Sequence, residues 1–519
     1  MIATSTPPDT FPDEGHDSQV VDGDSRRRDF ADDFDFVVVG TGAAGAVAAH
    51  ALAERGFSVG LAEEGPWIRT REVQRDVDHV FTRAVRDRGM QVAQGRTIIP
   101  VLQGRAVGGS TLINSAIAWR IPGDVLDEWS KDFGVSITEE ELAPHFDALE
   151  RDLSVRSVPD EVLGENNRLF LEACKKRGYA AAPMRRYDAG CEGSGRCLQG
   201  CPKGRKQGMS VTYVPWALRL GARIHTSCKV ERVELRGGRA VGVVGRAAGG
   251  GRVHLRARLG VLVAASTVQT PNILHRSGVR ARALGRHFQA HPGVGLGGLF
   301  DRPIHMSFGA TQGAESIHFR STDRFKLETI SMPPELAAAR MPGVGLDLMQ
   351  RLDRLDDIAV WVAQFRARAQ GRISRDLFGN DSISYTPTEE DVRVVRKALA
   401  TIADLLFDAG AREVWPGIHG VPFTLRGHDD VRFLREGPLD PRAYSFIATH
   451  LFGAARMGPN PTTSVVDADF GVHGTSSFWV VDSSVFPTNL GVNPQHSIMA
   501  LSRLCAVRVA ERARRSDAA

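Results

Sequence analysis

The chain has little of what marks several classes of protein. Its 519 residues include only 6 cysteines, and its formal net charge is +4 at pH 7. That charge is small for the length, so it predicts neither a nucleic-acid partner nor binding to a membrane surface. No apolar run reaches the ~18 residues needed to cross a bilayer, so we expect no transmembrane segment. The length instead predicts about two to three domains with an ample core.

Large apolar side chains are nearly absent from residues 1–33, which are rich in Pro, Asp and Ser. Such a segment cannot bury enough apolar surface to offset the entropy of ordering, so we expect a disordered N-terminal tail. Arg27 and Arg28 faintly resemble a twin-arginine export signal. The apolar stretch that follows is part of the glycine motif described next, and no cleavage site is separable from it. We therefore expect a cytoplasmic protein.

A dinucleotide-binding pattern follows this tail. Residues 34–39 form an apolar β run, residues 40–45 read GTGAAG, and an alanine-rich helical stretch leads to a second strand at 58–62. Glu63 ends that strand, where a carboxylate accepts hydrogen bonds from ribose hydroxyls. The complete βαβ context predicts a dinucleotide site, and the acid disfavours the 2′-phosphate of NADP.

Each glycine of this motif has a separate predicted role. Gly40 permits a tight turn after the strand, and Gly42 lets the backbone approach the pyrophosphate. Gly45 lets the helix pack closely on the strand.

Three more signals occur along the chain. In GRAVGGSTLIN at residues 104–114, Gly108 and Gly109 let the backbone lie flat against a bulky planar ligand. An apolar strand at 260–265 precedes the sequence STVQTPNIL. Another apolar strand, at 478–481, ends in an acid, Asp482.

The last seventy residues hold two polar signals inside apolar segments. His450 lies in THLFGAARMG and can accept a proton near neutral pH. Asn493 and Pro494 are typical of a helix N-cap and first helical position, and they open a predicted helix that continues to about residue 515. A helix start presents free N–H groups and a positive dipole end, which suit a site where negative charge develops.

These motifs, in this order, resemble the glucose–methanol–choline (GMC) flavin oxidoreductases from about residue 34 to residue 515. The resemblance implies an α/β (α+β) fold with a Rossmann-like FAD-binding domain and a substrate domain that contains an antiparallel sheet. By analogy the FAD-binding domain is discontinuous, and its pieces are residues 34–120, 205–295 and 445–515. The substrate domain would comprise residues 121–204 and 296–444. It includes residues 389–411, where apolar side chains at helical spacing predict an amphipathic core helix.

The resemblance also assigns the residues of the site. His450 would act as general base on the alcohol hydroxyl, and Asn493 would hold the substrate oxygen. The FAD-binding residues would be Gly40, Gly42, Gly45, Glu63, Gly108, Gly109, Ser110, Asn114, Asp482, Pro494 and His496. For His496, simple packing at the helix start is an equal alternative. Relatives with a covalently attached flavin carry a His close to the position of Ile113, so we expect noncovalent FAD here.

Three of the cysteines are close together, in CEGSGRCLQGCP at residues 191–202. Cys191, Cys197 and Cys201 resemble the segment that holds a [3Fe–4S] cluster in iron–sulfur GMC dehydrogenases for sugars and polyols. The neighbouring GCPKGRKQG also resembles loops of long-chain-alcohol oxidases, for which no cluster is implied. A disulfide with a spare thiol and a purely structural loop are further alternatives. The other cysteines are scattered and predicted to be ordinary buried thiols: Cys174, Cys228 and Cys505.

The sequence thus predicts an FAD-dependent enzyme that oxidises a small-molecule alcohol, with a dehydrogenase favoured over an oxygen-dependent oxidase. A dehydrogenase would need an electron-acceptor protein or a quinone as partner. Two other classes stay open: a GMC-like FAD-containing lyase and a noncatalytic flavin-binding subunit.

Overall fold

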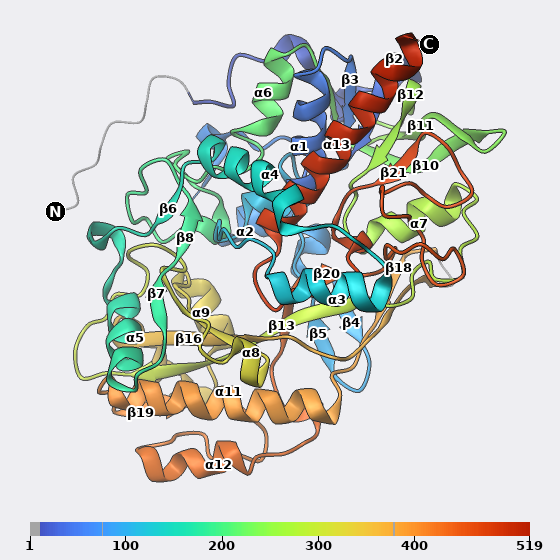
Figure 1. The fold of residues 1–519 in the computed structure, drawn as a ribbon. Coiled ribbons are helices and arrows are strands. Elements are labelled where there is room, and N and C mark those ends of the chain that lie inside the picture. Colours follow the sequence, from blue (N-terminus) through green and yellow to red (C-terminus); the bar gives the residue numbers. More distant parts are fainter. Residues whose placement is uncertain (1–10, 75, 377–378, 519) are drawn as a thin grey trace.

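Two large β-sheets organise the chain in the computed structural model, which describes residues 11–74, 76–376 and 379–518 (Figure 1). The first sheet has eight strands in the order β1-β9-β3-β2-β12-β11-β10, and β21 pairs with β12. Their bounds are β1 Val20–Asp22, β2 Phe30–Val39, β3 Val59–Ala62, β9 Arg223–Thr226, β10 Cys228–Arg236, β11 Arg239–Ala247, β12 Arg252–Val263 and β21 Phe478–Val480. β1, β9, β3, β2, β12 and β21 pair in parallel, whereas β10, β11 and β12 form an antiparallel meander. The first sheet therefore contains the predicted βαβ unit.

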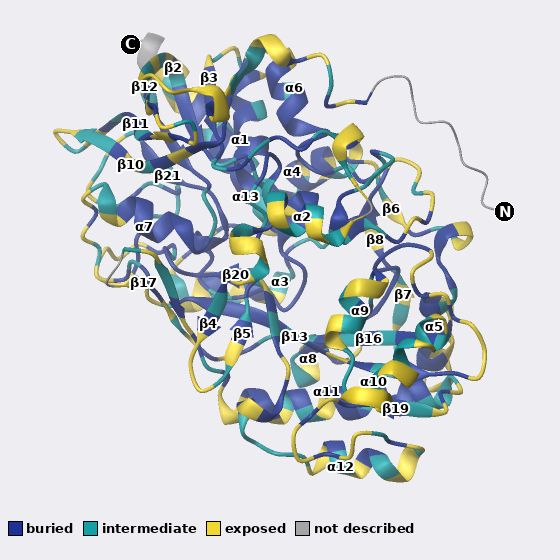
Figure 2. Cartoon of the chain, turned by 180° about the vertical axis from the view of Figure 1, so that it is seen from behind, coloured by how far each residue is buried: buried dark blue, intermediate teal, exposed yellow. Residues whose placement is uncertain are grey.

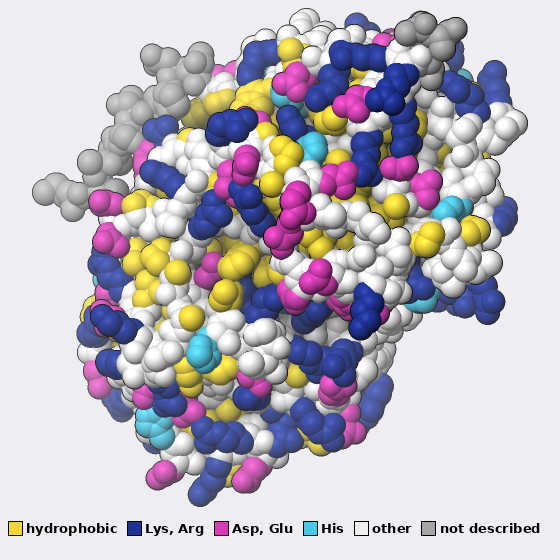
Figure 3. All heavy atoms as spheres, in the orientation of Figure 1, with side chains coloured by type: hydrophobic (Ala, Val, Ile, Leu, Met, Phe, Trp, Pro, Cys, Tyr) yellow, Lys and Arg dark blue, Asp and Glu magenta, His cyan; other side chains and the backbone are white. Residues whose placement is uncertain are grey.

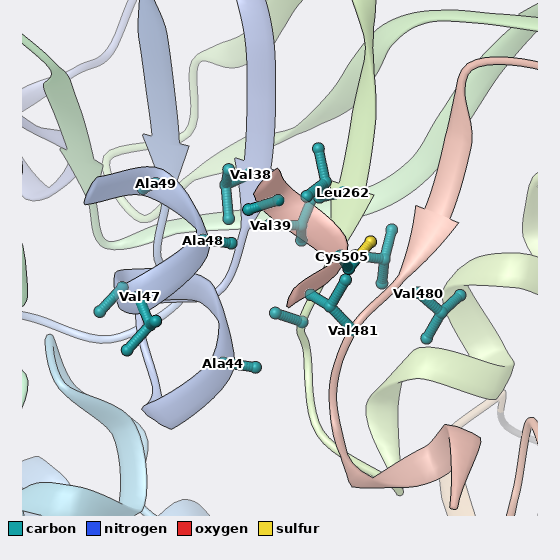
Figure 4. Packing of buried hydrophobic residues seen from close by; sticks show 14 of the residues in the cluster. Val38, Val39, Ala44, Val47, Ala48, Ala49, Leu262, Val480, Val481 and Cys505 are labelled. Carbon is teal, nitrogen blue, oxygen red and sulfur yellow. The ribbon is translucent and has the colours of Figure 1, made fainter. Parts of the chain in front are cut away.

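Small side chains let two helices pack tightly against this sheet. Helix α1 (Ala43–Ala53) is alanine-rich and almost wholly buried, and it contacts the C-terminal helix α13 (Gln495–Ala518). Figure 4 shows Val39, Leu262 and Cys505 close together where β2, β12 and α13 meet. A helix that is apolar on all sides is expected in the interior of a domain, and α1 has that position.

The second sheet is antiparallel and has seven strands in the order β19-β13-β16-β15-β14-β7, with β20 paired to β13. Their bounds are β7 Ala181–Pro183, β13 Gln289–Leu299, β14 Ala314–Ser316, β15 Phe325–Thr329, β16 Ile358–Phe365, β19 Glu413–Trp415 and β20 Ile447–Phe452. Helix α11 (Glu389–Asp408) runs across it and contacts β13, β15, β16 and β19 (Figure 1). Thr388 and Asp391 cap its first turn reciprocally, and its buried face is apolar, as the helical spacing predicts.

Smaller elements surround these sheets. Four strands form a third sheet: β4 Val92–Gln94, β5 Ile98–Pro100, β17 Arg372–Arg375 and β18 Asp381–Ser384. Strands β6 Val155–Ser157 and β8 Arg185–Tyr187 pair with each other. The remaining α-helices are α2 Val77–Ala84, α3 Gly123–Phe133, α4 Glu139–Asp152, α5 Glu165–Lys176, α6 Tyr213–Arg219, α7 Gln269–Arg276, α8 Arg320–Asp323, α9 Pro334–Arg340, α10 Gly345–Leu352 and α12 Arg432–Arg435.

The second sheet meets the first along β20, because the hydroxyl of Thr267 after β12 donates to the carbonyl of Leu451 and the N–H of Gly453 donates to the carbonyl of Ser483 after β21. The predicted boundary at residue 295 falls inside β13, and β20, which lies in the predicted FAD-binding segment 445–515, belongs to the second sheet through its pairing with β13. His450 therefore lies on a strand of the second sheet, next to the first. The division into FAD-binding and substrate domains stays a prediction.

The predicted disordered tail is ordered from residue 11 onward. Strand β1 joins the first sheet beside β9, and β2 already begins at Phe30. Phe11 is buried, and the buried Asp13 carboxylate accepts hydrogen bonds from the backbone N–H and hydroxyl of Thr70. The expectation of disorder was wrong for residues 11–33, because backbone pairing and a few anchors stabilise a segment of polar composition. Residues 1–10 of the predicted tail lie outside the described residues.

Burial and surface charge follow the composition. In Figure 2 strand β3 and helix α1 are mostly dark blue, whereas α10 is largely exposed. Lys and Arg are interspersed with Asp and Glu over the face shown in Figure 3, in line with the small net charge. Within the described residues, none of the helices combines the length and the apolar character that a membrane span needs.

Candidate active site

A cavity of about 1130 Å³ lies where the two sheets meet. The residues that follow β2, β3, β12 and β21 line one part of it, so the carboxyl ends of the parallel strands face the cavity. Ligands of open α/β sheets bind at this edge. The volume exceeds the ~300–1,000 Å³ of common small-ligand pockets, which leaves room for a large ligand beside a smaller one.

The first glycine motif divides into packing and lining positions. Gly40 has φ +93°, and a Cβ there would lie 2.4 Å from the carbonyl oxygen of Ala264. A Cβ on Gly45 would lie 1.9 Å from the carbonyl oxygen of Gly40, so this glycine permits the close helix–strand packing. Gly42 lines the cavity and has no atom closer than 4.0 Å to an added Cβ. Of these three glycines, only Gly42 could carry a Cβ without a clash inside the protein.

The second glycine cluster lies against the first. A Cβ on Gly109 would be 2.9 Å from the Cα of Gly42, and the N–H of Gly108 donates to the hydroxyl of Thr41 at 3.1 Å. Gly109 lines the cavity and Gly108, with φ +90°, packs against Ser210 instead. Two glycine loops far apart in sequence thus form one cradle.

Ser110 and Asn114 continue this lining. The Ser110 hydroxyl accepts a hydrogen bond from the N–H of Gly104 at 2.9 Å, and the Asn114 amide donates to the side chain of Gln495 in the first turn of α13. Ile113 also lines the cavity. The second glycine cluster is thereby tied to the start of the C-terminal helix.

Two buried acids hold the loops at the strand ends. Glu63 accepts hydrogen bonds from the N–H of Thr41 at 3.0 Å and the N–H of Gly65 at 2.9 Å. Asp482 accepts from the N–H of Ser266 at 3.0 Å. Burial raises the pKa of both carboxyls despite these bonds, and both line the cavity.

His450 faces the same cavity from β20. It is half-buried, and its Nδ1 lies 3.3 Å from Nδ1 of the fully buried His291 on β13. A neutral His450 that accepts a proton at Nε2 carries its hydrogen on Nδ1, and Nδ1 of His291 is placed to accept that hydrogen. Burial lowers the pKa of His450 to about 4, and Lys326 acts in the same direction against Glu328. At neutral pH His450 is therefore an uncharged imidazole.

Asn493 lines the same cavity as His450, together with Pro494. Its Oδ1 accepts a hydrogen bond from Nζ of Lys326 at 2.6 Å. Helix α13 begins at Gln495, one residue later than predicted, and the carbonyl of Pro494 accepts the first helical bond, from the N–H of Ile498. The Asn493 side chain thus bonds to a neighbouring strand in place of the expected N-cap.

A buried cluster of charges behind Asn493 was missed by the sequence analysis. Lys326 Nζ lies 2.5 Å from Glu315 Oε2 and 2.8 Å from Glu328 Oε1. Trp119 Nε1 donates to Glu315 at 2.8 Å, and Gln312 Nε2 donates to Glu328 at 2.6 Å. The only available signal was the alternation in FKLET at residues 325–329, which would ordinarily indicate a solvated face.

Family comparisons agree with this geometry. A model of the GMC oxidoreductase family matches residues 34–293 with its N-terminal part and residues 368–502 with its C-terminal part. The chain belongs to the GMC oxidoreductase family.

Relatives of this GMC oxidoreductase include an uncharacterised GMC-type oxidoreductase of Mycobacterium tuberculosis, 37% identical over 90% of this chain and 74% of the relative. A long-chain-alcohol oxidase of Arabidopsis thaliana is 26% identical over 94% of this chain and 68% of the relative. A 2-methyl-1,2-propanediol dehydrogenase of Mycolicibacterium austroafricanum is 25% identical, over 91% and 94%. Among solved structures, pyridoxine 4-oxidase from Mesorbium loti matches with TM-score 0.71 and 18% identity, over 91% of this chain and 98% of that one. These likenesses confirm the expected fold.

His496 lies apart from the residues that line the cavity of the GMC oxidoreductase. Its ring is fully buried near Phe146 and Tyr187, and its Nε2 lies 3.3 Å from a carboxylate oxygen of Glu150. Burial lowers its pKa, although Glu150 acts in the opposite direction. The structure therefore places His496 in helix packing, the alternative given for this residue above, and its contact with the cofactor stays a prediction.

The three clustered cysteines border a cavity of only about 10 Å³. The buried Arg186 guanidinium donates to Cys197 Sγ at 3.0 Å, and among the described residues no three His, Cys, Asp or Glu side chains are grouped to hold a metal ion. All six cysteines are free thiols. The described side chains therefore do not form a metal site, and a [3Fe–4S] cluster on Cys191, Cys197 and Cys201 stays a prediction from the motif alone.

Lys206 connects this cysteine loop to the second glycine cluster. Its buried ammonium donates to the carbonyl oxygens of Leu112 at 2.7 Å, Asn114 at 2.9 Å and Cys197 at 2.8 Å. Burial lowers the pKa of Lys206 to about 8, while the nearby side chains of Cys197 and Cys201 act to raise it.

We expect Lys206→Met to lower the stability of the protein by several kcal/mol. The substitution leaves three carbonyl oxygens without their donor, and each buried unsatisfied group costs roughly 1–3 kcal/mol. Thermal unfolding monitored by circular dichroism measures the effect, with the exposed Lys131→Met as the matched control. Equal melting temperatures for the two variants would contradict the role of Lys206.

Proposed function

We propose that this GMC oxidoreductase binds FAD noncovalently and oxidises an alcohol to an aldehyde or ketone. The observation that carries the proposal is the convergence of the glycine cradle, His450 and Asn493 on one cavity. FAD, when bound, supplies the acceptor for the hydride that leaves the alcohol carbon. The residues of the chain then have to bind the alcohol, take its hydroxyl proton and stabilise its oxygen.

The cradle suits the pyrophosphate and ribose of FAD. Gly42 and Gly109 leave space for close approach at the N-terminal end of α1, where N–H groups and the helix dipole favour phosphate. Glu63 is placed at the end of β3 for the ribose hydroxyls. Ile113 cannot form a covalent bond to a flavin, which supports noncovalent binding.

His450 has the protonation state that a general base needs. It is uncharged at neutral pH and can take the proton of the alcohol hydroxyl. Asn493 has an amide that can hold the substrate oxygen without competing for that proton.

The second-sheet side of the cavity indicates the kind of alcohol. It is lined mainly by apolar side chains, among them Met306, Ile330, Met332, Leu336, Val360 and Trp415. Such a lining supports an alcohol with an apolar body, since apolar surface is removed from water on binding.

The electron acceptor is proposed to be a protein or a quinone, which makes the enzyme a dehydrogenase. The alternative is oxygen, because relatives include both a long-chain-alcohol oxidase and a diol dehydrogenase. The motif-based [3Fe–4S] cluster would favour the dehydrogenase, but no part of the chemistry above depends on it.

Anaerobic titration of the FAD-loaded protein with a panel of alcohols tests the proposal. Bleaching of the flavin absorbance is the expected result, and it would exclude both a lyase and a noncatalytic flavin-binding protein. Reoxidation by air, compared with reoxidation by a quinone, separates oxidase from dehydrogenase. A protein that does not take up FAD would overturn the proposal.

The pH dependence of turnover gives a second test. Because the pKa of His450 is lowered to about 4, its basic form persists down to about pH 5 and is lost only below that. We expect kcat/KM to rise with pH through about 4 and to be level up to neutrality. An unperturbed histidine would place this limb near pH ~6.5. A pH series of initial rates distinguishes the two positions.

A further inference from the structure

The side chain of Asn493 has a single orientation that its neighbour allows. Lys326 donates to its Oδ1 at 2.6 Å, and an ammonium group has three donors and no acceptor. The amide oxygen must therefore face Lys326, and the NH₂ group must point away from it. Among the described residues, Nδ2 of Asn493 makes no hydrogen bond, and the residue lines the cavity.

Lys326 is itself fixed on several sides. Its side chain is fully buried, with Glu315 and Glu328 in contact and the ring of Trp119 at 5.1 Å from Nζ. Glu315 and Glu328 are register partners on β14 and β15, so their carboxylates would repel each other without a cation between them. Burial acts to lower the pKa of Lys326, but the two carboxylates outweigh it and keep the ammonium charged.

We propose that Lys326 is a positioning residue for alcohol oxidation, which acts by turning the NH₂ group of Asn493 toward the substrate oxygen. The inference rests on the proposed function. When His450 takes the hydroxyl proton, negative charge develops on the alcohol oxygen, and a preoriented N–H of Asn493 stabilises it there. Asn493 is thus a hydrogen-bond donor to the substrate, and its acceptor oxygen is permanently occupied by Lys326.

The effect of the cluster's net charge can be separated from the effect of the hydrogen bond between Lys326 and Asn493. With all three groups ionised, Lys326, Glu315 and Glu328 carry a net charge of −1. The double variant Lys326→Met with Glu328→Gln keeps that net charge but loses the contact to Asn493. The single variant Glu328→Gln changes the charge but keeps the contact, so the two variants form a matched pair.

We expect kcat of the double variant to fall by about 10- to 100-fold while FAD content is unchanged. Removal of one preorganised donor lowers kcat by about 10²–10³. A donor that is still present but free to rotate should lower kcat by less. Glu328→Gln is expected to keep kcat within about threefold and to shift the acid limb of the pH profile, since it removes a negative charge near His450. In an Asn493→Ala background, removal of Lys326 should have little further effect, because residues that act as a unit are non-additive.

A spectroscopic readout makes the test independent of turnover. The side-chain NH₂ signals of Asn493, assigned by their loss in Asn493→Ala, should have chemical shifts displaced from those of a free primary amide in the wild-type protein. In the double variant these signals should move toward the free-amide positions, because the amide oxygen no longer accepts from an ammonium group. Unchanged signals, or full additivity in the Asn493→Ala background, would overturn the role of Lys326. If none of the alcohols tested bleaches the flavin of the wild-type protein, the proposed function fails. The amide signals then still decide whether Lys326 orients Asn493.

Discussion

Replacing His450 by glutamine is expected to lower kcat/KM for alcohol oxidation by about 10²–10⁴, the usual contribution of a positioned general base. Glutamine keeps a polar side chain of similar length but cannot take a proton at neutral pH. His450 has no role in the glycine cradle, so bound FAD and its visible absorbance should be retained. Stopped-flow reduction by a saturating alcohol isolates the chemical step from acceptor turnover.

A surface histidine supplies the control for this substitution. His305 is 62% exposed at its side chain, and its nearest ion-pair partner is Asp356 at 3.6 Å. His305→Gln should therefore react at the wild-type rate. A His450→Gln enzyme within about threefold of wild type would show that another group takes the proton, and His291 would be the next candidate because its Nδ1 lies closest to His450.

The residues that were predictable are those whose role depends on backbone conformation. Gly40 and Gly45 are needed because no other residue fits beside the carbonyls they face, and that need is local and visible in the sequence. The same holds for helix α11, which apolar side chains at helical spacing indicate. Close-range geometry of this kind leaves a pattern in the sequence.

The residues that were missed depend on contacts between distant segments. Lys326 is 167 residues away in sequence from Asn493, the predicted residue that it contacts. Lys326 and Glu328 in FKLET look like the solvent-exposed face of a strand. Both faces of β15 are in fact buried. His291 likewise lies in an ordinary strand and becomes significant only because β13 pairs with β20, which brings it to His450. No local pattern contains such pairings.

Gly42 offers the second large effect, because its role is expected to concern the ligand and not the fold. Gly42→Ala adds a Cβ whose nearest protein atom is 4.0 Å away, at a φ of −67° that alanine adopts readily. As the N-cap of α1, alanine in place of glycine costs about 1 kcal/mol or less. The methyl group would instead occupy the space left for the pyrophosphate, and overpacking of about 1–3 kcal/mol corresponds to roughly 5- to 150-fold weaker FAD binding.

The neighbouring glycines make this a differential test. Gly45→Ala would place its Cβ 1.9 Å from the carbonyl oxygen of Gly40, so it should lower the melting temperature of the protein before any ligand is added. Gly42→Ala should leave that temperature nearly unchanged and reduce affinity in a fluorescence titration with FAD. Equal affinity for wild type and Gly42→Ala would mean that the pyrophosphate does not approach the chain at this point. The cradle would then be a packing feature of the two glycine loops, and the cofactor would have to be held chiefly by groups farther along the cavity, such as Glu63 and Ser110.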